Sequence, residues 1–256
     1  MDAKKSTKIN RLLRMVPSGG VFISSWMTRN GISGSLQRHY KDSGWLQSIG
    51  TGVMIRTGES PTIYNAISCI NEQSGKHFHM GAMTALELAG YSHYIPMGRA
   101  VAVVCCPKGE WLPGWVSTYD WGVDVRTFTS GAFAMDEGLS AITMGNFKVT
   151  VSSPERAFME CLYMAPRHYN LTDLYYVMEQ LTTLRPAVVQ KLLELCPSIK
   201  VKRLFLYMAR KAGHAWMEDV DTSIIDLGSG KRVIAAGGIY DPKYQIVLPA
   251  ELVNYE

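Results

Sequence analysis

Between residues 33 and 43 lie side chains whose types and spacing suit contact with DNA. Drawn as a helix, with about 100° of turn per residue, this segment turns Leu36 and Tyr40 inward. Arginine can form two hydrogen bonds to guanine, glutamine can do so to adenine, and serine can bond a base or a phosphate. Any short helix has a polar outer face, so the pattern alone leaves a merely solvated surface as the alternative. The outward stripe consists of Gly34, Arg38 and Lys41, with Ser35 and Gln37 beside it.

The elements around this segment would hold it as the recognition helix of a winged helix-turn-helix. Ser33 is its natural N-cap, and a short helix at residues 24–29 precedes it. An amphipathic helix is predicted before both, at residues 6–16, with its lysines and arginines on one face. Two short strands follow as a hairpin, at residues 45–49 and 53–56. This order of helices and hairpin is that of a winged helix-turn-helix.

The turn of that hairpin, formed by Gly50, Thr51 and Gly52, would bring backbone N–H groups against phosphate. Arg56 follows at the end of the second strand and adds a positive charge. The first 60 residues carry nine Lys and Arg side chains and three acidic ones, a net charge of +6, whereas the other 196 residues carry −2. A basic N-terminal module predicts a polyanion as partner.

Beyond residue 60 the pattern changes to a mixture of helices and strands. Helical periodicity runs through residues 153–213, where Ser153 and Pro154 open the first helix. Further helices are expected at 61–71, 81–89, 171–181, 186–195 and 199–212, and strands at 100–106, 123–128, 147–151, 223–227, 232–236 and 244–248. The sequence therefore predicts an α+β fold. It has a winged helix-turn-helix DNA-binding domain at residues 1–60 and a mixed C-terminal domain at residues 61–256, with several helices and a small antiparallel sheet.

Motifs that would indicate an enzyme or a metal site fail at the required positions. The segment GSGK at 228–231 is similar to a phosphate-binding loop, but Ile225 stands where an earlier glycine is required, and Arg232 where Ser or Thr is required. His77 and His79 share one face of a possible strand without a third ligand at a convincing spacing. The nucleophile motif GxSxG is absent from the sequence. We therefore expect no enzymatic activity, no cofactor and no bound metal.

Composition places the chain among globular proteins, with 47% hydrophobic and 19% charged residues. The longest apolar run, at residues 100–106, is far too short to cross a bilayer, and the N-terminus lacks the apolar core of a signal peptide. Five cysteines form an odd set without CxxC spacing. We expect a cytoplasmic protein with reduced thiols and no membrane partner.

The helix expected at residues 199–212 is apolar on two sides. One face is a regular apolar stripe, and on the other Leu206 lies among Arg203 and Arg210. Such a helix is either packed on both sides or exposes a surface for a partner. His214 and Trp216 follow directly, which makes this the second basic cluster of the chain.

Residues 12–56 (LLRMVPSGGVFISSWMTRNGISGSLQRHYKDSGWLQSIGTGVMIR) resemble the N-terminal winged helix of the AbiEi family. Its members are antitoxins and transcriptional regulators of bacterial type IV toxin-antitoxin, abortive-infection systems. The resemblance continues at residues 83–94 (MTALELAGYSHY), 153–166 (SPERAFMECLYMAP) and 201–249, which contain RLFLYMARKAGHAW, DLGSGKR and YQIVLP. It covers nearly the whole chain and is weakest at about residues 95–145.

The resemblance implies a phage-defence repressor that binds inverted repeats in double-stranded DNA upstream of its own operon. It would be a monomer or weak dimer in solution, with two copies on each operator. The C-terminal domain would counteract a nucleotidyltransferase-like toxin, either by contact or indirectly. The implied DNA contacts are Ser33, Ser35, Gln37, Arg38, Lys41, Gly50 and Thr51, to which the charge pattern adds Arg56. The candidate antitoxin surface consists of Arg203, Arg210, His214 and Trp216.

Two other classes of function stay open on the residues alone. A winged-helix transcription factor with a ligand-sensing C-terminal domain would need a closed apolar pocket. An enzyme would need titratable groups that converge in a cleft. The operator and the toxin are not encoded in this chain, and a neighbouring nucleotidyltransferase gene would decide the class.

Overall fold

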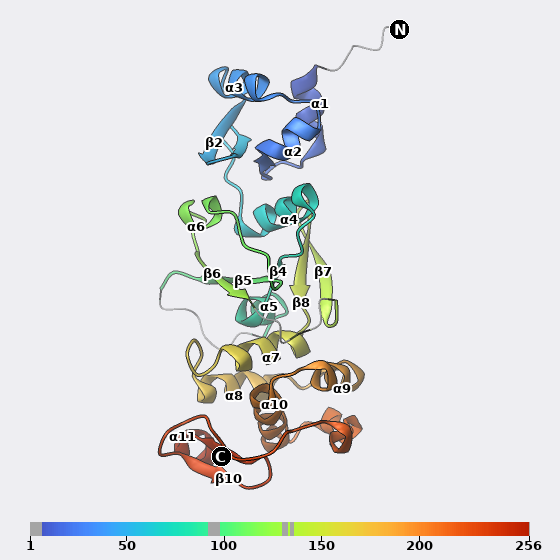
Figure 1. The fold of residues 1–256 in the computed structure, drawn as a ribbon, viewed down its shortest axis with the longest axis vertical. Coiled ribbons are helices and arrows are strands. Elements are labelled where there is room, and N and C mark those ends of the chain that lie inside the picture. The colour runs from blue at the N-terminus through green and yellow to red at the C-terminus, as the bar shows by residue number, and fades with distance from the viewer. Residues whose placement is uncertain (1–6, 92–97, 130–132, 134–135, 256) are drawn as a thin grey trace. The chain divides into compact units, whose positions relative to one another are not determined.

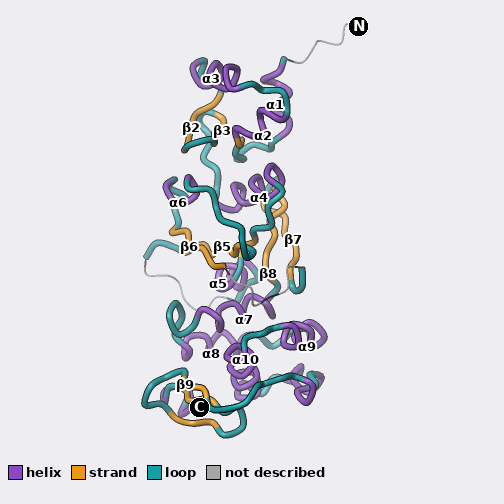
Figure 2. Tube along the Cα trace, viewed as in Figure 1, coloured by secondary structure: helices purple, strands orange, loops and turns teal. Residues whose placement is uncertain are grey.

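The computed structural model describes residues 7–91, 98–129, 133 and 136–255 (Figure 1). The chain forms two compact units. Unit 1 holds the described residues of Met1–Met80, Gly98–Thr129 and Ala141–Thr150, and unit 2 holds those of Gly81–Met97, Ser130–Ser140 and Val151–Glu256. Both units contain helices and strands, which confirms the predicted α+β class (Figure 2).

Unit 1 begins with the predicted helices and hairpin. The helices are α1 (Lys8–Met15), α2 (Ser24–Arg29) and α3 (Gly34–Asp42). In the sheet, β3 (Val53–Arg56) pairs antiparallel with β1 (Phe22–Ile23) on one side and with β2 (Leu46–Gly50) on the other. The apolar side chains that pack together inside are Leu12, Val21, Phe22, Met27, Ile32, Leu46, Val53 and Ile55. The observed bounds of these three helices and of the two hairpin strands agree with the predicted bounds within two residues. β1 was not predicted.

Capping chemistry fixes where α3 begins and ends. Ser33 is its N-cap, and the Ser33 hydroxyl accepts a hydrogen bond from the Leu36 N–H. Gly44 follows the helix with a φ of 74°, a left-handed conformation that favours glycine. α2 has the predicted bounds, and its N-cap is Ile23, which makes no side-chain capping bond.

The rest of unit 1 comprises α4 (Ile63–Ser74), α6 (Trp115–Thr118) and most of a five-stranded sheet. The strand order is β6–β5–β4–β8–β7, in which β5 pairs parallel with β6 and antiparallel with β4. The strands are β4 (His79–Met80), β5 (Val101–Cys106), β6 (Asp124–Thr129), β7 (Leu139–Met144) and β8 (Phe147–Ser152). β7 was not predicted, and β4 lies at the end of the possible strand that contains His77 and His79.

Side chains of α4 join the winged helix to the rest of unit 1. The Gln73 amide accepts a hydrogen bond from the Ile23 N–H at 2.8 Å and donates one to the Val21 carbonyl at 2.6 Å. Gln73 is only 4% exposed, so its amide takes the place of a neighbouring strand at the edge formed by β1. Asn65 likewise donates to the Gly19 carbonyl at 3.1 Å. The boundary expected at residue 60 therefore falls inside a compact unit.

Unit 2 is built mainly of helices. They are α5 (Ala82–Leu88), α7 (Pro154–Met164), α8 (Leu171–Gln180), α9 (Pro186–Leu195), α10 (Ile199–Ala212) and α11 (Ala250–Asn254). α7 contacts α5, α8, α9 and α10, and it is buried over almost its whole length. α9 and α10 have the predicted bounds.

The small sheet of unit 2 is mixed and not purely antiparallel. β11 (Ile246–Leu248) pairs antiparallel with β10 (Ile239–Asp241) and parallel with β9 (Arg232–Val233). The strand expected at residues 223–227 does not form, because residues 222–224 make a 3-10 turn. There the Asp221 carboxylate accepts the Ser223 N–H at 2.9 Å, a local bond that favours a turn over a strand.

Candidate nucleic-acid interface

The first turn of α3 presents small polar groups to solvent. Ser33, Gly34 and Ser35 are all exposed. The Ser33 hydroxyl accepts the Leu36 N–H at 3.4 Å and lies 2.9 Å from the Ser35 hydroxyl. A Cβ at Gly34 would meet no atom within 4 Å, so another backbone can approach closely there. The start of a helix attracts anions through its unpaired N–H groups and its dipole, which suits a DNA phosphate.

Gln37 faces the protein interior, which corrects its prediction as a DNA contact. It is 3% exposed. Its Nε2 donates to Thr28 Oγ1 at 3.0 Å, and its Oε1 accepts from Ser24 Oγ at 2.5 Å, so both ends of the amide are used inside the fold. In the sequence Gln37 follows Leu36 directly and precedes Tyr40 by three residues. That spacing places it beside the inner face and was the available signal for burial.

The outer face of α3 carries two cations and an imidazole. Arg38 and Lys41 are exposed as predicted, and so is His39, which lies between them in the sequence. Among the described residues, no hydrogen bond or ion pair engages these three side chains. Asp42 is exposed near the end of the same face. His39 and Asp42 are additions to the predicted interface, because the burial of Gln37 fixes which side of the helix turns outward.

The wing rests against α6 at one of its predicted contact residues. A Cβ at Gly50 would lie 2.5 Å from the Trp115 Cβ, so only glycine fits at this half-buried position. Thr51 and Gly52 are exposed, and Gly52 has a φ of 76° that favours glycine. The wing therefore offers Thr51 and the backbone of Gly52 to a ligand, whereas Gly50 packs within unit 1.

Arg56 holds parts of the winged helix together, which corrects its prediction as a DNA contact. Its Nη2 donates to the Leu13 and Val16 carbonyls at the end of α1, and its Nη1 pairs with Glu59 at 3.3 Å. Its guanidinium carbon lies 5.6 Å from the centre of the Phe22 ring. With 17% of the side chain exposed, its donors are used by the fold and not by solvent.

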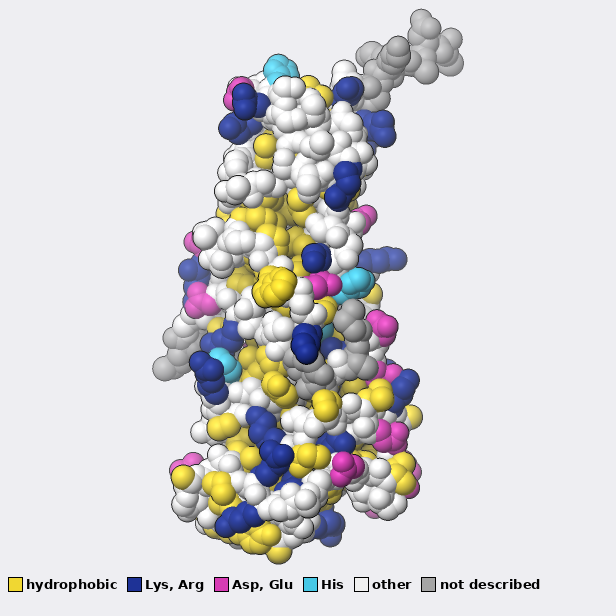
Figure 3. Space-filling model, viewed as in Figure 1, with side chains coloured by type: hydrophobic (Ala, Val, Ile, Leu, Met, Phe, Trp, Pro, Cys, Tyr) yellow, Lys and Arg dark blue, Asp and Glu magenta, His cyan; other side chains and the backbone are white. Residues whose placement is uncertain are grey.

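α1 adds a second basic face to unit 1. Lys8, Arg11 and Arg14 are exposed, whereas Leu12 and Val16 are buried against the winged helix. In Figure 3, several Lys and Arg side chains lie on the surface of α1 and α3. Such charges attract DNA of any sequence through its phosphates.

Arg203 is buried, which corrects its prediction as part of an antitoxin surface. It is 1% exposed, and every residue from Val201 to Ala209 is buried, so α10 is packed on both sides. The guanidinium of Arg203 holds the turn at residues 228–230 in place through backbone carbonyls. They belong to Leu227 at 2.8 Å, Gly228 at 3.2 Å, Gly230 at 2.7 Å and Gln245 at 3.0 Å.

The other predicted antitoxin residues differ in exposure. Trp216 is 6% exposed, and its Nε1 donates to the Leu181 carbonyl at 2.8 Å, so it also belongs to the core. His214 is half-buried, and its Nε2 lies 2.6 Å from the Met178 carbonyl. Arg210 is exposed. Of the four residues, Arg210 is the one that presents its charge to solvent.

The two histidines considered for a metal site differ in burial, and the cysteines are all buried. His77 is exposed, with its Nδ1 3.5 Å from Glu110 Oε1, whereas His79 is buried in β4. All five cysteines are buried. Burial raises the pKa of the Cys69 and Cys106 thiols to about 11, so both stay protonated and weakly nucleophilic near neutral pH.

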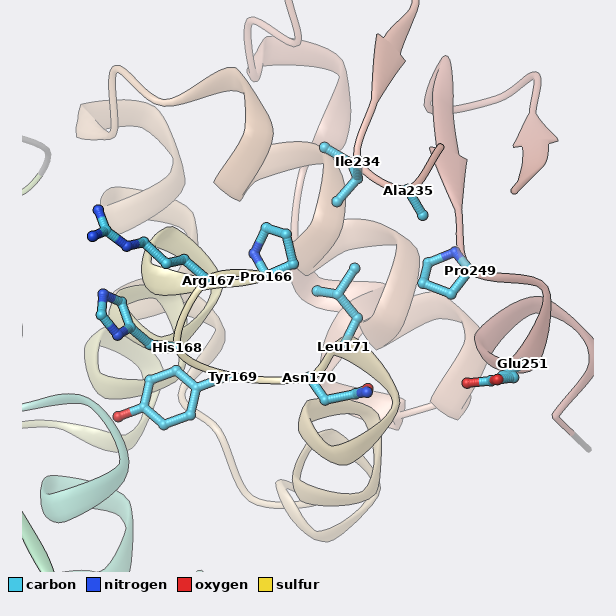
Figure 4. A pocket seen from close by; sticks show the side chains of 10 residues that line it. All are labelled: Pro166, Arg167, His168, Tyr169, Asn170, Leu171, Ile234, Ala235, Pro249 and Glu251. Atoms are coloured by element: carbon cyan, nitrogen blue, oxygen red, sulfur yellow. The ribbon is translucent and has the colours of Figure 1, made fainter. Parts of the chain in front are cut away.

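Two of the hollows among the described residues bear on a ligand-sensing role. In unit 2, a hollow of about 360 Å³ lies beside the loop before α8 (Figure 4), where the side chains of Arg167 and His168 extend away from Ile234 and Pro249. In unit 1, an open groove of about 950 Å³ lies between α2, the wing and α6, and no charged side chain lines it. Neither is the closed apolar pocket that a ligand sensor would need.

Comparison with known proteins gives two family matches. The model described as "Transcriptional regulator, AbiEi antitoxin N-terminal domain" matches residues 5–97, and "Transcriptional regulator, AbiEi antitoxin, Type IV TA system" matches residues 99–249. The fold is similar to the crystal structure of the RV2827C protein from Mycobacterium tuberculosis, with a TM-score of 0.60 and 19% sequence identity. That match covers 96% of this chain and 92% of the other. None of the curated proteins matches the chain. Within the described residues, no helix is long and apolar enough to cross a membrane.

Proposed function

The chain belongs to the AbiEi antitoxin family of transcriptional regulators of type IV toxin-antitoxin systems, and we propose that it represses its own operon through inverted repeats in the upstream DNA. DNA-binding regulation follows from the family, which is not a class of enzymes. What we propose beyond the family is that the operator consists of inverted repeats and that the toxin is nucleotidyltransferase-like. We place DNA contact on α3, α1 and the wing, and the antitoxin surface on unit 2.

The exposed face of α3 carries the DNA part of this proposal. Arg38, His39 and Lys41 are exposed without a hydrogen-bond or ion-pair partner among the described residues. A recognition helix reads base edges with such side chains, while Ser33 and Ser35 at its start suit phosphate. Lys8, Arg11 and Arg14 of α1 would add sequence-independent attraction, as described above.

Inverted repeats would take two copies of the chain. Each half-site presents the same base edges in opposite orientation, so one copy binds each half. A monomer or weak dimer in solution becomes a pair on the operator. Half-site centres are then expected about one helical turn apart, or a multiple of it.

The antitoxin part rests on exposed basic side chains of unit 2. Arg210 is exposed, and Lys243 Nζ lies 5.4 Å from the centre of the Tyr244 ring. Burial raises the pKa of the Tyr244 phenol, and the positive charge of Arg210 opposes this rise. We propose this spot as the contact that counteracts a nucleotidyltransferase-like toxin.

A binding titration tests the DNA part. The full chain is titrated onto a labelled duplex from the region upstream of its own coding sequence, with a scrambled duplex of equal composition as control. If five cations of α1 and α3 neutralise phosphates, affinity should fall roughly 500-fold between 50 and 200 mM salt. Absence of binding at 50 mM salt, with the chain folded by circular dichroism, would reject this part.

Protection of cells tests the antitoxin part. The chain is co-expressed with the toxin encoded beside it, and Arg210→Glu is compared with Arg167→Glu, which reverses another exposed arginine of unit 2. Loss of protection with Arg210→Glu alone supports the proposed surface. Equal protection by both variants places the antitoxin surface elsewhere.

A further inference from the structure

We propose that α3 selects operators in which two adjacent base pairs each present guanine in the major groove, read by Arg38 and His39. This inference rests on the proposed DNA binding and adds the class of sequence that is recognised. Three observations carry it: the donors on the exposed face of α3, the placement of these two residues, and the absence of charge on the wing.

The exposed face of α3 offers hydrogen-bond donors and, near its end, the Asp42 carboxylate, but no amide. Gln37 is the one amide side chain in α3, and its burial and its bonds to Ser24 and Thr28 remove it from the groove. Adenine is read by Asn or Gln, which donates to N7 and accepts from N6. Guanine instead presents two acceptors, N7 and O6, and these match the N–H groups of Arg38 and of an imidazole.

Arg38 and His39 are consecutive residues, and both are exposed. A helix rises about 1.5 Å and turns about 100° per residue, so the two side chains diverge from neighbouring points on the helix surface. Such divergence suits base pairs stacked about 3.4 Å apart. The centroids of the His39 and Tyr40 rings lie 6.0 Å apart. The backbone carbonyl of His39 accepts a hydrogen bond from the Ser43 N–H at 2.9 Å. The backbone of His39 is thus fixed by the helix, while its ring nitrogens stay available to a base.

The wing provides no charged side chain that could read DNA shape. Residues 45–55 contain no Lys, Arg, His, Asp or Glu. Narrow minor grooves at A-tracts attract inserted Arg, Lys or His side chains, and Thr51 and Gly52 at this tip cannot serve that role. Sequence preference therefore falls to α3. Gln47, exposed on β2, is the competing amide reader, and its variant is part of the test.

Selection from random DNA tests the inference. The full chain is mixed with a library of duplexes that carry a randomised core of about 20 base pairs, and bound duplexes are sequenced over several rounds. The wild type should enrich two adjacent base pairs with guanine on one strand. Arg38→Ala should lose the preference for guanine at one of these base pairs, and His39→Ala should lose it at the other. In each case the enrichment of guanine over the other bases should fall about tenfold. His39→Asn should change its position from guanine to adenine, because an amide bonds adenine.

Matched variants separate reading from folding and from general attraction. His168→Ala removes an exposed histidine of unit 2 and should leave the motif unchanged. Lys41→Ala should weaken all sequences alike. An unchanged motif in His39→Ala, a wild-type motif without the guanine pair, or a shift of that pair in Gln47→Ala would each overturn the inference. A folded wild type that enriches no sequence at 50 mM salt would instead reject the proposed DNA binding itself.

Discussion

Gln37 of α3 and Ser24 of α2 bond each other in both directions. Ser24 Oγ donates to Gln37 Oε1 at 2.5 Å, and Gln37 Nε2 donates to the Ser24 carbonyl at 3.1 Å. Because the two helices are joined at this point, the rotation of α3 about its axis is fixed from the inside. That rotation turns Arg38 and His39 toward solvent.

Removal of this amide should weaken the fold but not the choice of DNA sequence. We expect Gln37→Ala to lower the free energy of unfolding by about 1–3 kcal/mol, because buried polar partners lose their bonds. Gln47→Ala, at an exposed position of β2, should change it by no more than about 0.5 kcal/mol. Urea unfolding followed by circular dichroism measures both. If the Gln37→Ala protein is as stable as the wild type but has lost its preference for a DNA sequence, Gln37 contacts DNA after all and this prediction is wrong.

The two arginines predicted to touch DNA should behave differently. Arg56→Met removes the donors that hold Leu13 and Val16, and should lower the free energy of unfolding by about 1–3 kcal/mol. Arg38→Ala should leave stability within about 0.5 kcal/mol and reduce affinity for the selected duplex by about 1–3 kcal/mol. Thermal melting and anisotropy titration are measured on both variants. Equal loss of affinity by Arg38→Ala on selected and scrambled duplexes would make Arg38 a phosphate contact.

Acid should loosen the junction around Glu59. Burial by itself would raise the pKa of this carboxyl, but hydrogen bonds from the Ser18 hydroxyl and the Gly19 N–H, together with Arg56, outweigh burial and lower it. A lowered pKa stabilises the fold at pH values above the unfolded-state pKa of about 4.3, and this contribution disappears as the pH falls through the folded-state value. The wild type should thus lose more stability below about pH 4.3 than Glu59→Gln does. Urea unfolding from pH 6 to pH 3 measures this, and parallel curves for the two proteins would contradict it.

The two arginines of α10 form a second matched pair. Arg203→Ala leaves four backbone carbonyls without their donor, so we expect a loss of at least about 3 kcal/mol in the free energy of unfolding. Arg210→Ala, at an exposed position, should change it by no more than about 0.5 kcal/mol. Thermal unfolding compares the two. Similar melting temperatures would mean that Arg203 does not anchor the turn at residues 228–230.

Two glycines of the winged helix should respond to alanine in opposite ways. Gly50→Ala brings a Cβ to 2.5 Å from the Trp115 Cβ and should destabilise unit 1 by about 1–3 kcal/mol. Gly34→Ala meets no atom within 4 Å and should leave stability unchanged or raise it by up to about 0.5 kcal/mol. If a DNA backbone approaches α3 at Gly34, the same change should lower DNA affinity. Affinity unchanged in Gly34→Ala would show that DNA keeps its distance there.

Local rules explain how much of the fold was predictable. α9 and α10 have the predicted bounds because Pro186 stands at the first helical position of α9, and Gly213, with a φ of 67°, ends α10. α3 was predicted because Ser33 caps it. These signals lie within a few residues of the element that they define.

The errors concern contacts between distant parts of the chain. Gln37 is buried because Ser24 and Thr28, nine or more positions earlier, supply its partners. Arg203 is buried because carbonyls more than 20 positions later surround it. A polar side chain on a helix gives no local sign of such partners, so exposure of the candidate site was less predictable than the helices that carry it.

The amide of Gln73, which bonds Val21 and Ile23, also determines how this protein can be divided. A fragment that ends at residue 60 keeps α3 intact but lacks the group that closes the edge of its own sheet. Unpaired sheet edges associate with one another, so such a fragment should aggregate or dimerise through β1. We therefore expect that the winged helix of this chain cannot be moved alone into another protein. A transfer that keeps it folded would have to include α4.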